Sequence, residues 1–334
     1  MISLKGKKLK ALAAGLMLTL ALGILGCGGD AKDGKKVEKA NVGIVQLVEH
    51  EALDAANKGF VDGLASKGYK EGQNVTFDKQ NAQADQSNLQ NIAHRFVNNK
   101  VDLICAIATP AAQTVANVTS DIPIVATAVT DYKTAKLVKE NDKPGTNVTG
   151  TTDMNPVAEQ LDLLLKLVPN AKTIGTIYCS SEVNSQLQVE ILKKAAAAKG
   201  ITVKEATVSN VNDIQQAAHS LVGSVQAIYV PTDNVLASAI PTLISVTDEA
   251  KLPVICGEGG MVRAGGLATL GVDYYKLGFQ TGEMAADILS GKAKPADMAI
   301  QAQKEFKPVI NAKEAAKIGL TVPEDVLKGA EVVK

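Results

Sequence analysis

From residue 41 onward, short runs of β-branched and apolar residues alternate with longer segments in which apolar residues recur at helical spacing. We expect strands at 41–48, 74–80, 102–108, 123–129, 173–179, 202–208, 227–231, 253–256 and 267–272. We expect helices between them at 53–66, 88–98, 111–118, 157–167, 186–199, 214–222, 236–250 and 277–289. Such alternation is typical of repeated βα units built around a parallel sheet.

Two sets of four or five such units, separated near Asp-Lys-Pro-Gly at 142–145, predict two similar lobes, and 334 residues suffice for about two domains. The expected fold class is α/β, with two doubly wound parallel-sheet lobes. The segment from Tyr274 on contains too little strand for a third domain, so we expect it to complete the earlier lobes through several hinge crossings. The expected limits are 41–150 plus about 272–302 for lobe 1, and 151–271 plus about 303–334 for lobe 2.

The first 26 residues carry four lysines and then a sixteen-residue apolar run that ends before Cys27. A spanning helix needs about 20 apolar residues, so this run fits a secretory signal peptide better. Ile-Leu-Gly-Cys at 24–27 resembles the bacterial lipobox, in which the cysteine is diacylated after cleavage. We therefore expect residues 27–40 to form a flexible tether, and Cys27 to anchor the protein extracytoplasmically, in the cell envelope, to a bacterial membrane. An ordinary secretory signal with an incidental cysteine is the alternative.

Composition and motifs argue against several function classes. The 35 basic residues equal the 35 acidic ones, and only Arg95 and Arg263 are arginines, so we expect no nucleic-acid partner. The chain has no tryptophan, which disfavours sugar binding and glycan processing. It also has no P-loop, dinucleotide fingerprint, nucleophile elbow or zinc-ligand spacing. We therefore expect a protein that is not an enzyme, with no catalytic residue, no cofactor and no metal.

Three further cysteines lie within or at the end of apolar runs: Cys105, Cys179 and Cys256. An odd number cannot all pair with one another. We interpret them as small buried apolar residues, with a disulfide between Cys179 and Cys256 as the alternative.

Polar residues follow most of the expected strands, and ligands of open parallel sheets bind beyond the carboxyl ends of strands. The candidate binding residues are Glu49, His50, Asp54, Thr109, Pro110, Asp131, Asp153, Glu182, Asn184, Ser185, Asp233, Asn234, Glu258 and Asp273. A threonine before a proline is typical of a helix start, where free N–H groups bind an anion such as a carboxylate. The acidic members could hold an ammonium, Asp233 first and Glu182 and Asp273 next. Together they predict a pocket for a zwitterion; the alternative for each residue is a helix cap or turn former.

Several of these segments resemble one family. They are Glu-His-Glu-Ala-Leu-Asp at 49–54, Ala-Ile-Ala-Thr-Pro-Ala-Ala-Gln at 106–113, Asn-Val-Thr-Gly at 147–150, Glu-Val-Asn-Ser at 182–185, Val-Pro-Thr-Asp-Asn at 230–234 and Gly-Val-Asp-Tyr-Tyr at 271–275. In this order they resemble the solute-binding lipoproteins of ABC importers for tryptophan and tyrosine, over essentially the whole mature chain. Glu51 departs from the family pattern, which has a proline there.

The resemblance implies a type I periplasmic-binding-protein fold, with three hinge crossings and a ligand held between the lobes. It implies an aromatic or related amino acid as ligand, near Thr109, Glu182, Asn184, Ser185, Asp233 and Asn234. The resulting hypothesis is a monomeric, membrane-tethered receptor that delivers an amino acid to the permease and ATPase of an ABC importer. The alternatives are a sensory module of the same fold that acts on a receptor, and a branched aliphatic amino acid as ligand.

Overall fold

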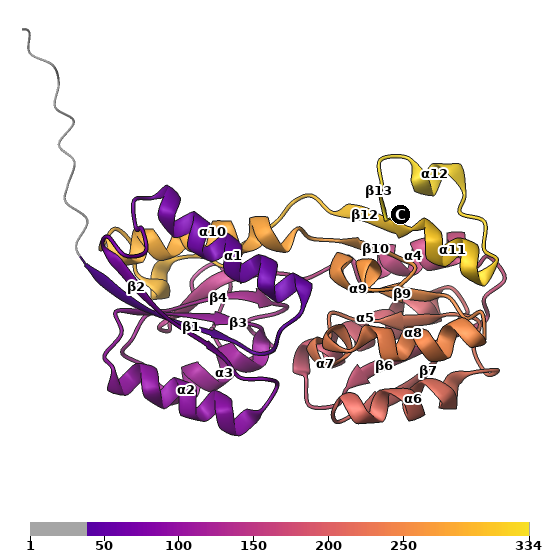
Figure 1. Cartoon of the computed structure of the whole chain (residues 1–334), viewed down its shortest axis with the longest axis horizontal. Helices are drawn as coiled ribbons and strands as arrows, with labels where there is room; N and C mark the ends of the chain where they lie inside the picture. The colour runs from indigo at the N-terminus through magenta and orange to yellow at the C-terminus, as the bar shows by residue number, and fades with distance from the viewer. Residues whose placement is uncertain (1–38, 334) are drawn as a thin grey trace, which may run out of the picture. The chain divides into compact units, whose positions relative to one another are not determined.

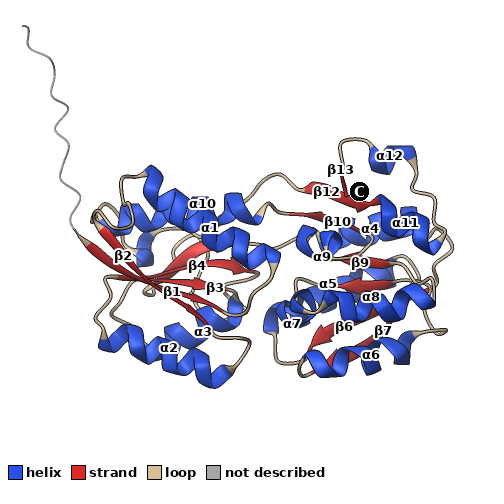
Figure 2. Cartoon of the chain, viewed as in Figure 1, coloured by secondary structure: helices blue, strands red, loops and turns tan. Residues whose placement is uncertain are grey.

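The computed structural model describes residues 39–333, which form two sheets with helices on both faces of each (Figures 1 and 2). The first sheet has the strand order β11-β5-β4-β3-β1-β2, and all its neighbouring strands are parallel. Its strands are β1 (Ala40–Gln46), β2 (Val75–Asn81), β3 (Leu103–Ile107), β4 (Ile124–Val129), β5 (Val148–Thr152) and β11 (Gln301–Ala302). Its helices are α1 (Glu51–Ser66), α2 (Gln86–Asn98), α3 (Thr109–Val118) and α10 (Tyr274–Leu289).

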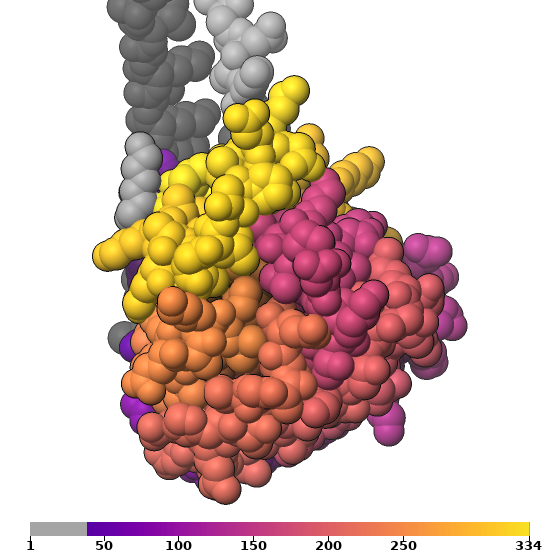
Figure 3. All heavy atoms as spheres, turned by 90° about the vertical axis from the view of Figure 1, so that its right-hand side faces the viewer, coloured from indigo at the N-terminus to yellow at the C-terminus, as the bar shows by residue number. Residues whose placement is uncertain are grey.

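The second sheet has the order β13-β12-β10-β9-β8-β6-β7, and only β12 runs antiparallel to its neighbour β10. Its strands are β6 (Thr173–Cys179), β7 (Thr202–Val208), β8 (Ile228–Val230), β9 (Val254–Cys256), β10 (Ala268–Gly271), β12 (Lys307–Asn311) and β13 (Glu331–Val333). Its helices are α4 (Val157–Leu167), α5 (Val183–Ala198), α6 (Ile214–Leu221), α7 (Asn234–Ser238), α8 (Ile240–Glu249), α9 (Gly259–Arg263), α11 (Ala312–Ile318) and α12 (Glu324–Leu327). Figure 3 looks onto this lobe and shows the C-terminal segment, in yellow, gathered at one end of it.

Burial on both faces explains the apolar strands. Every residue of β3 and β4 is buried. In the second sheet, Ile228 and Val230 belong to one core cluster, and Ala227 and Tyr229 belong to another. Successive side chains of a strand point to opposite faces, so each face of this sheet has its own core. The expected α/β fold with two doubly wound lobes is confirmed.

The chain passes between the two sheets three times, at 153–156, 272–273 and 303–306. From Tyr274 on it supplies α10 and the edge strand β11 to the first lobe, and then β12 and β13 to the second sheet. These crossings position polar residues where the strand ends of both sheets meet.

Helices α1 and α10 cover one face of the first sheet and touch each other through glycines (Figure 1). A Cβ atom on Gly278 would lie 1.9 Å from the carbonyl oxygen of Ala56. One on Gly59 would lie 2.1 Å from the carbonyl oxygen of Tyr275. Only glycine permits this approach of the two backbones.

The structure corrects three expectations. The stretch at 142–145 does not separate the lobes, because β5 follows it within the first sheet. The helix expected at 236–250 is two helices that break at Ala239, since Pro241 in the first turn of α8 cannot continue a preceding helix. Strands β5, β11, β12 and β13, and helices α9, α11 and α12, were not expected at all.

Candidate functional site

A small, partly open chamber lies where the strand ends of the two sheets meet. Residues from both lobes and from one crossing segment line it: His50, Leu53, Ala128, Thr130, Asp153, Asn184, Thr232, Asp233, Asn234, Ala237, Glu258, Met261 and Tyr274. We call it the inter-lobe chamber. The expected binding residues His50, Asp153, Asn184, Asp233, Asn234 and Glu258 are all in its lining.

Glu182, the residue before α5, lies beside the chamber and organises its second-lobe wall. Its carboxylate accepts hydrogen bonds from the side-chain amides of Asn184 (2.9 Å) and Asn234 (2.6 Å). It also accepts bonds from the backbone N–H groups of Asn234 and Val235 at 3.1–3.2 Å. Burial, and second the negative charge of Asp233, raise the pKa of Glu182 to about 8. A cation bound nearby would offset the free-energy cost of ionising Glu182 in this buried position.

Asp233 caps α7, and three internal donors hold its carboxylate. The backbone N–H of Leu236 donates to one oxygen at 2.9 Å. The backbone N–H of Cys179 (2.6 Å) and the hydroxyl of Ser185 (2.7 Å) donate to the other. Burial raises its pKa. The geometry therefore gives Asp233 a structural task, and its contact with a ligand ammonium stays a prediction.

His50 joins the two lobes across the chamber. It is the residue before α1, and its Nε2 lies 3.3 Å from the side-chain oxygen of Asn234. Burial lowers the pKa of His50 to about 4, so the imidazole is neutral near pH 7. A neutral ring has one N–H donor and one acceptor nitrogen, so His50 can form hydrogen bonds with a ligand but cannot form an ion pair with it.

Asp153 comes from the crossing segment after β5 and lines the same chamber. The Thr130 hydroxyl donates to one of its oxygens at 3.0 Å, and the Tyr274 hydroxyl donates to the other at 2.6 Å. Burial raises the pKa of Asp153. Each oxygen accepts one of these bonds, so the carboxylate keeps lone pairs for a further donor.

Three buried polar atoms near the strand ends have no partner among the described residues. They are Nδ1 of His50, Oγ1 of Thr109 and Oδ1 of Asn184. An unpaired buried polar atom costs about 1–3 kcal/mol, so unpaired atoms grouped at a site are typical of groups that await a ligand. Thr109 begins α3, which follows β3. Strand β3 pairs with β4, and the end of β4 lines the chamber.

Backbone strain marks the same place. Ala108, at the end of β3, has φ of +89°, and Ala128, near the end of β4, has φ of +55°. Residues with a side chain rarely adopt positive φ, and such residues cluster at binding sites. Ala128 lines the chamber, and Ala108 precedes the unpaired Thr109.

The structure puts the remaining expected residues outside the chamber lining. Asp131 accepts from the backbone N–H of Thr134, and Asp273 caps α10. Asp54 accepts from the side-chain amide of Gln46 at 2.6 Å. Glu49 is exposed and Pro110 half-buried. Their contact with a ligand stays a prediction.

Sequence reasoning missed part of the lining: Leu53, Ala128, Thr130, Thr232, Ala237, Met261 and Tyr274. The strand-end signal was available for Thr130, which directly follows β4, and for Thr232, which follows β8 after Pro231. For the apolar members no signal exists, because an apolar residue at a strand end or in a helix resembles any core residue.

Three further observations concern the cysteines, metal ions and membrane-spanning helices. Cys105, Cys179 and Cys256 are buried and unpaired, as interpreted from sequence. Within residues 39–333 no His, Cys, Asp and Glu side chains are grouped in a way that could hold a metal ion. None of the helices described there has the length and apolar character to cross a membrane. Cys27, the expected signal peptide and most of the expected tether lie outside the described residues.

The family model described as "ABC transporter substrate binding protein" matches residues 41–334. The chain belongs to this family. Substrate-binding proteins of this family act outside the cytoplasm and present their substrate to an ABC transporter. The resemblance found in the sequence is thereby confirmed.

Individual family members are similar along the whole chain. A tyrosine-binding protein from Clostridioides difficile (strain R20291) is 42% identical over 339 residues, covering 99% of this chain and 94% of that protein. A crystal structure from Streptococcus pneumonia in complex with L-Trp is 43% identical with a TM-score of 0.86, covering 89% of this chain and 100% of that one.

A third relative differs in its structure. It is the ligand-free, open structure of a substrate-binding protein with adhesive properties from Clostridium difficile, 45% identical, covering 88% of this chain and 99% of that one. Its TM-score to this chain is 0.68, against 0.86 for the L-Trp complex. The higher TM-score means that the chain described here is closer in structure to the ligand-bound relative than to the open one. Sequence divergence does not explain the difference, because the two identities are nearly equal.

Proposed function

We propose that this chain captures an aromatic amino acid in the inter-lobe chamber and delivers it, outside the cytoplasm, to an ABC importer. The similarity to a tyrosine-binding protein and to a structure holding L-Trp supports the ligand class. The fold supports the mechanism: a ligand that contacts both lobes stabilises the arrangement in which they are closed. The importer then recognises that arrangement.

The observation that carries this proposal is the set of unpaired buried atoms at the strand ends of both lobes, on His50, Thr109 and Asn184. A zwitterion supplies the missing partners. Its carboxylate would accept from the Thr109 hydroxyl and from the free N–H groups at the start of α3. Its ammonium would donate to Asp153, which has unused lone pairs, and to the Asn184 oxygen.

The side chain of the ligand would contact the apolar part of the chamber, which consists of Leu53, Ala128, Ala237 and Met261. These residues come from both lobes, so closure removes apolar surface from water on every side of an aromatic ring. The polar groups would then select an amino acid, and the apolar wall would select its side chain.

Four further parts of the proposal concern the whole protein. Cys27 carries the lipid that tethers it to a bacterial membrane, and residues 27–40 form the tether. The two lobes have limits near those expected from sequence, 41–150 plus about 272–302 and 151–271 plus about 303–334, with the whole of β5 (Val148–Thr152) in the first lobe. The protein acts as a monomer. It binds and releases its ligand chemically unchanged, without catalysis.

A thermal-shift screen of the full-length chain in detergent against the twenty amino acids and common sugars tests the proposal. A ligand at 100 times its Kd adds about 2.7 kcal/mol of stability, which gives a clear rise in Tm. We expect the rise with L-tyrosine, L-tryptophan or L-phenylalanine, and none with sugars. D-tyrosine is the matched control, because it offers the same groups in the wrong arrangement. No shift with any amino acid would contradict the proposal.

A further inference from the structure

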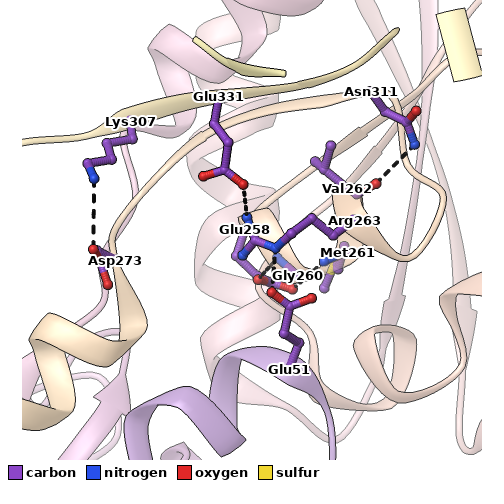
Figure 4. Close-up of polar contacts among 10 residues, drawn as sticks. All are labelled: Glu51, Glu258, Gly260, Met261, Val262, Arg263, Asp273, Lys307, Asn311 and Glu331. Carbon is purple, nitrogen blue, oxygen red and sulfur yellow. Dashed lines mark hydrogen bonds and ion pairs between the residues drawn. The ribbon is translucent and has the colours of Figure 1, made fainter. Parts of the chain in front are cut away.

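Arg263 lies at the end of α9 in the second lobe and contacts carboxylates from two directions (Figure 4). Its Nε donates to Glu51, in the first turn of α1 in the first lobe. Its Nη1 donates to Glu331 of β13, in its own lobe, at 2.8 Å. The pair Glu51–Arg263 therefore joins the two lobes, whereas Arg263–Glu331 lies within one of them.

This junction forms part of a cavity beside the inter-lobe chamber. Glu51, Arg263 and Glu331 line the cavity, and Glu258 and Tyr274 line both the cavity and the chamber. The junction is thus next to the proposed binding site without belonging to it. None of the three charged residues lines the chamber itself.

The second lobe holds the guanidinium in place. Glu331 binds it from β13. Gly259, at the start of α9, leaves room for it, because a Cβ there would lie 3.1 Å from both terminal nitrogens of Arg263. The arginine is therefore oriented before Glu51 approaches, which reduces the entropy lost when the pair forms.

We propose that the Glu51–Arg263 pair is a latch that stabilises the closed arrangement of the lobes and so tightens ligand binding. The inference about affinity rests on the proposed function. Parting the lobes separates Glu51 from Arg263, but leaves Arg263 with Glu331. The latch contributes only when the lobes are closed, and any group that favours the binding-competent state lowers the apparent Kd.

The expected size of the effect follows from exposure. The side chains of Glu51 and Arg263 are 49% and 35% exposed, so water and salt screen their attraction. Pairs of this kind change an equilibrium by about two- to fivefold. The latch is therefore expected to change the Kd by a small factor, while contacts with the ligand provide most of the affinity.

The test uses the full-length chain in detergent, titrated with L-tyrosine by calorimetry. We expect Glu51→Gln and Arg263→Gln each to raise the Kd about two- to fivefold, and the double variant to raise it no further. The difference from wild type should shrink between about 0.05 and 1 M NaCl. Asp78→Asn is the matched control: it breaks the pair of Asp78 with the other arginine, Arg95, inside the first lobe, and should leave the Kd unchanged.

A second measurement does not need the ligand to be known. Fluorophores placed through unnatural amino acids at the exposed Ser87 of α2 and Gln216 of α6 report the distance between the lobes by energy transfer. Without ligand, Glu51→Gln should lower the closed fraction and Asp78→Asn should not. Equal closed fractions in wild type and Glu51→Gln at low salt, or additive effects in the double variant, would overturn the latch. Failure of the wild type to bind L-tyrosine, L-tryptophan or L-phenylalanine while closure still depends on Glu51 would overturn only the proposed ligand.

Discussion

Replacing Asp233 with asparagine separates its structural task from its proposed role at the ligand. The substitution preserves size but turns one carboxylate oxygen into an NH2 group. In the structure one oxygen accepts from Leu236, and the other accepts from both Cys179 and Ser185. An amide has only one oxygen, so it cannot serve both sets of donors.

These hydrogen bonds determine how much stability the Asp233→Asn substitution removes. If the amide oxygen faces Leu236, the cap is retained, because asparagine caps as well as aspartate. The NH2 group then opposes the N–H of Cys179, which is buried and left unpaired at a cost of about 1–3 kcal/mol. Asp233 helps to raise the pKa of Glu182 through charge repulsion. Removing that repulsion offsets part of the cost of the unpaired N–H group. We expect a loss of about 1–2 kcal/mol in the free energy of unfolding.

Urea denaturation of the ligand-free protein at pH 7 measures this loss. Asp85→Asn is the control: Asp85 caps the exposed start of α2 through one hydrogen bond of 2.8 Å, and its replacement should cost less than about 0.5 kcal/mol. Calorimetric titration of Asp233→Asn then tests the ligand role. Binding weakened by about 2–5 kcal/mol would identify Asp233 as a partner of the ligand ammonium, and unchanged binding would leave that role to Asp153 and Asn184. A variant as stable as wild type would refute the argument from internal hydrogen bonds.

Three other perturbations follow from the structure and the sequence. Gly278→Ala places a Cβ against Ala56 and should destabilise the protein by about 3 kcal/mol in urea denaturation; a change below about 0.5 kcal/mol would show that α1 and α10 can separate freely. Burial raises the pKa of Glu258 to about 7, above its unfolded value, so its contribution to stability is present below about pH 4.5 and lost as the pH rises through 7. Wild type should therefore lose stability relative to Glu258→Gln over that interval, and parallel pH profiles would contradict this. Cys27→Ser should release the protein from membranes or leave it unprocessed with unchanged ligand affinity, and attachment that still needs detergent would mean the anchor lies elsewhere.

The alternation of strand and helix patterns was sufficient to predict the α/β fold, because strands buried on both faces leave continuous apolar runs. Strand β5 escaped because Gly150 and its threonines provide no such run. Strand β12 contains Pro308, which argues against a strand, and β11 has only two residues. Pairing with distant partners stabilises these elements, and such pairing leaves no local signal.

The rule that ligands bind beyond strand ends located several chamber residues, including His50, Asp153 and Asn234. It could not tell which carboxylates are occupied by internal donors, because that depends on bonds between strand ends far apart in sequence, such as Asp233 with Cys179. The Glu51–Arg263 pair spans 212 residues and was equally invisible.

The proposed function requires that the chamber recognise an amino-acid zwitterion, and removing one charged group of the ligand at a time tests this most directly. L-tyrosine and L-tryptophan would be titrated into the full-length chain by calorimetry. Each would be compared with two analogues of itself: the amine that lacks the carboxylate, and the carboxylic acid that lacks the ammonium. We expect at least one of the two amino acids to bind, and both of its analogues to bind about 30-fold more weakly or worse, since each leaves a buried charge or polar group unpaired. An analogue that binds within about threefold of its parent amino acid would contradict the account.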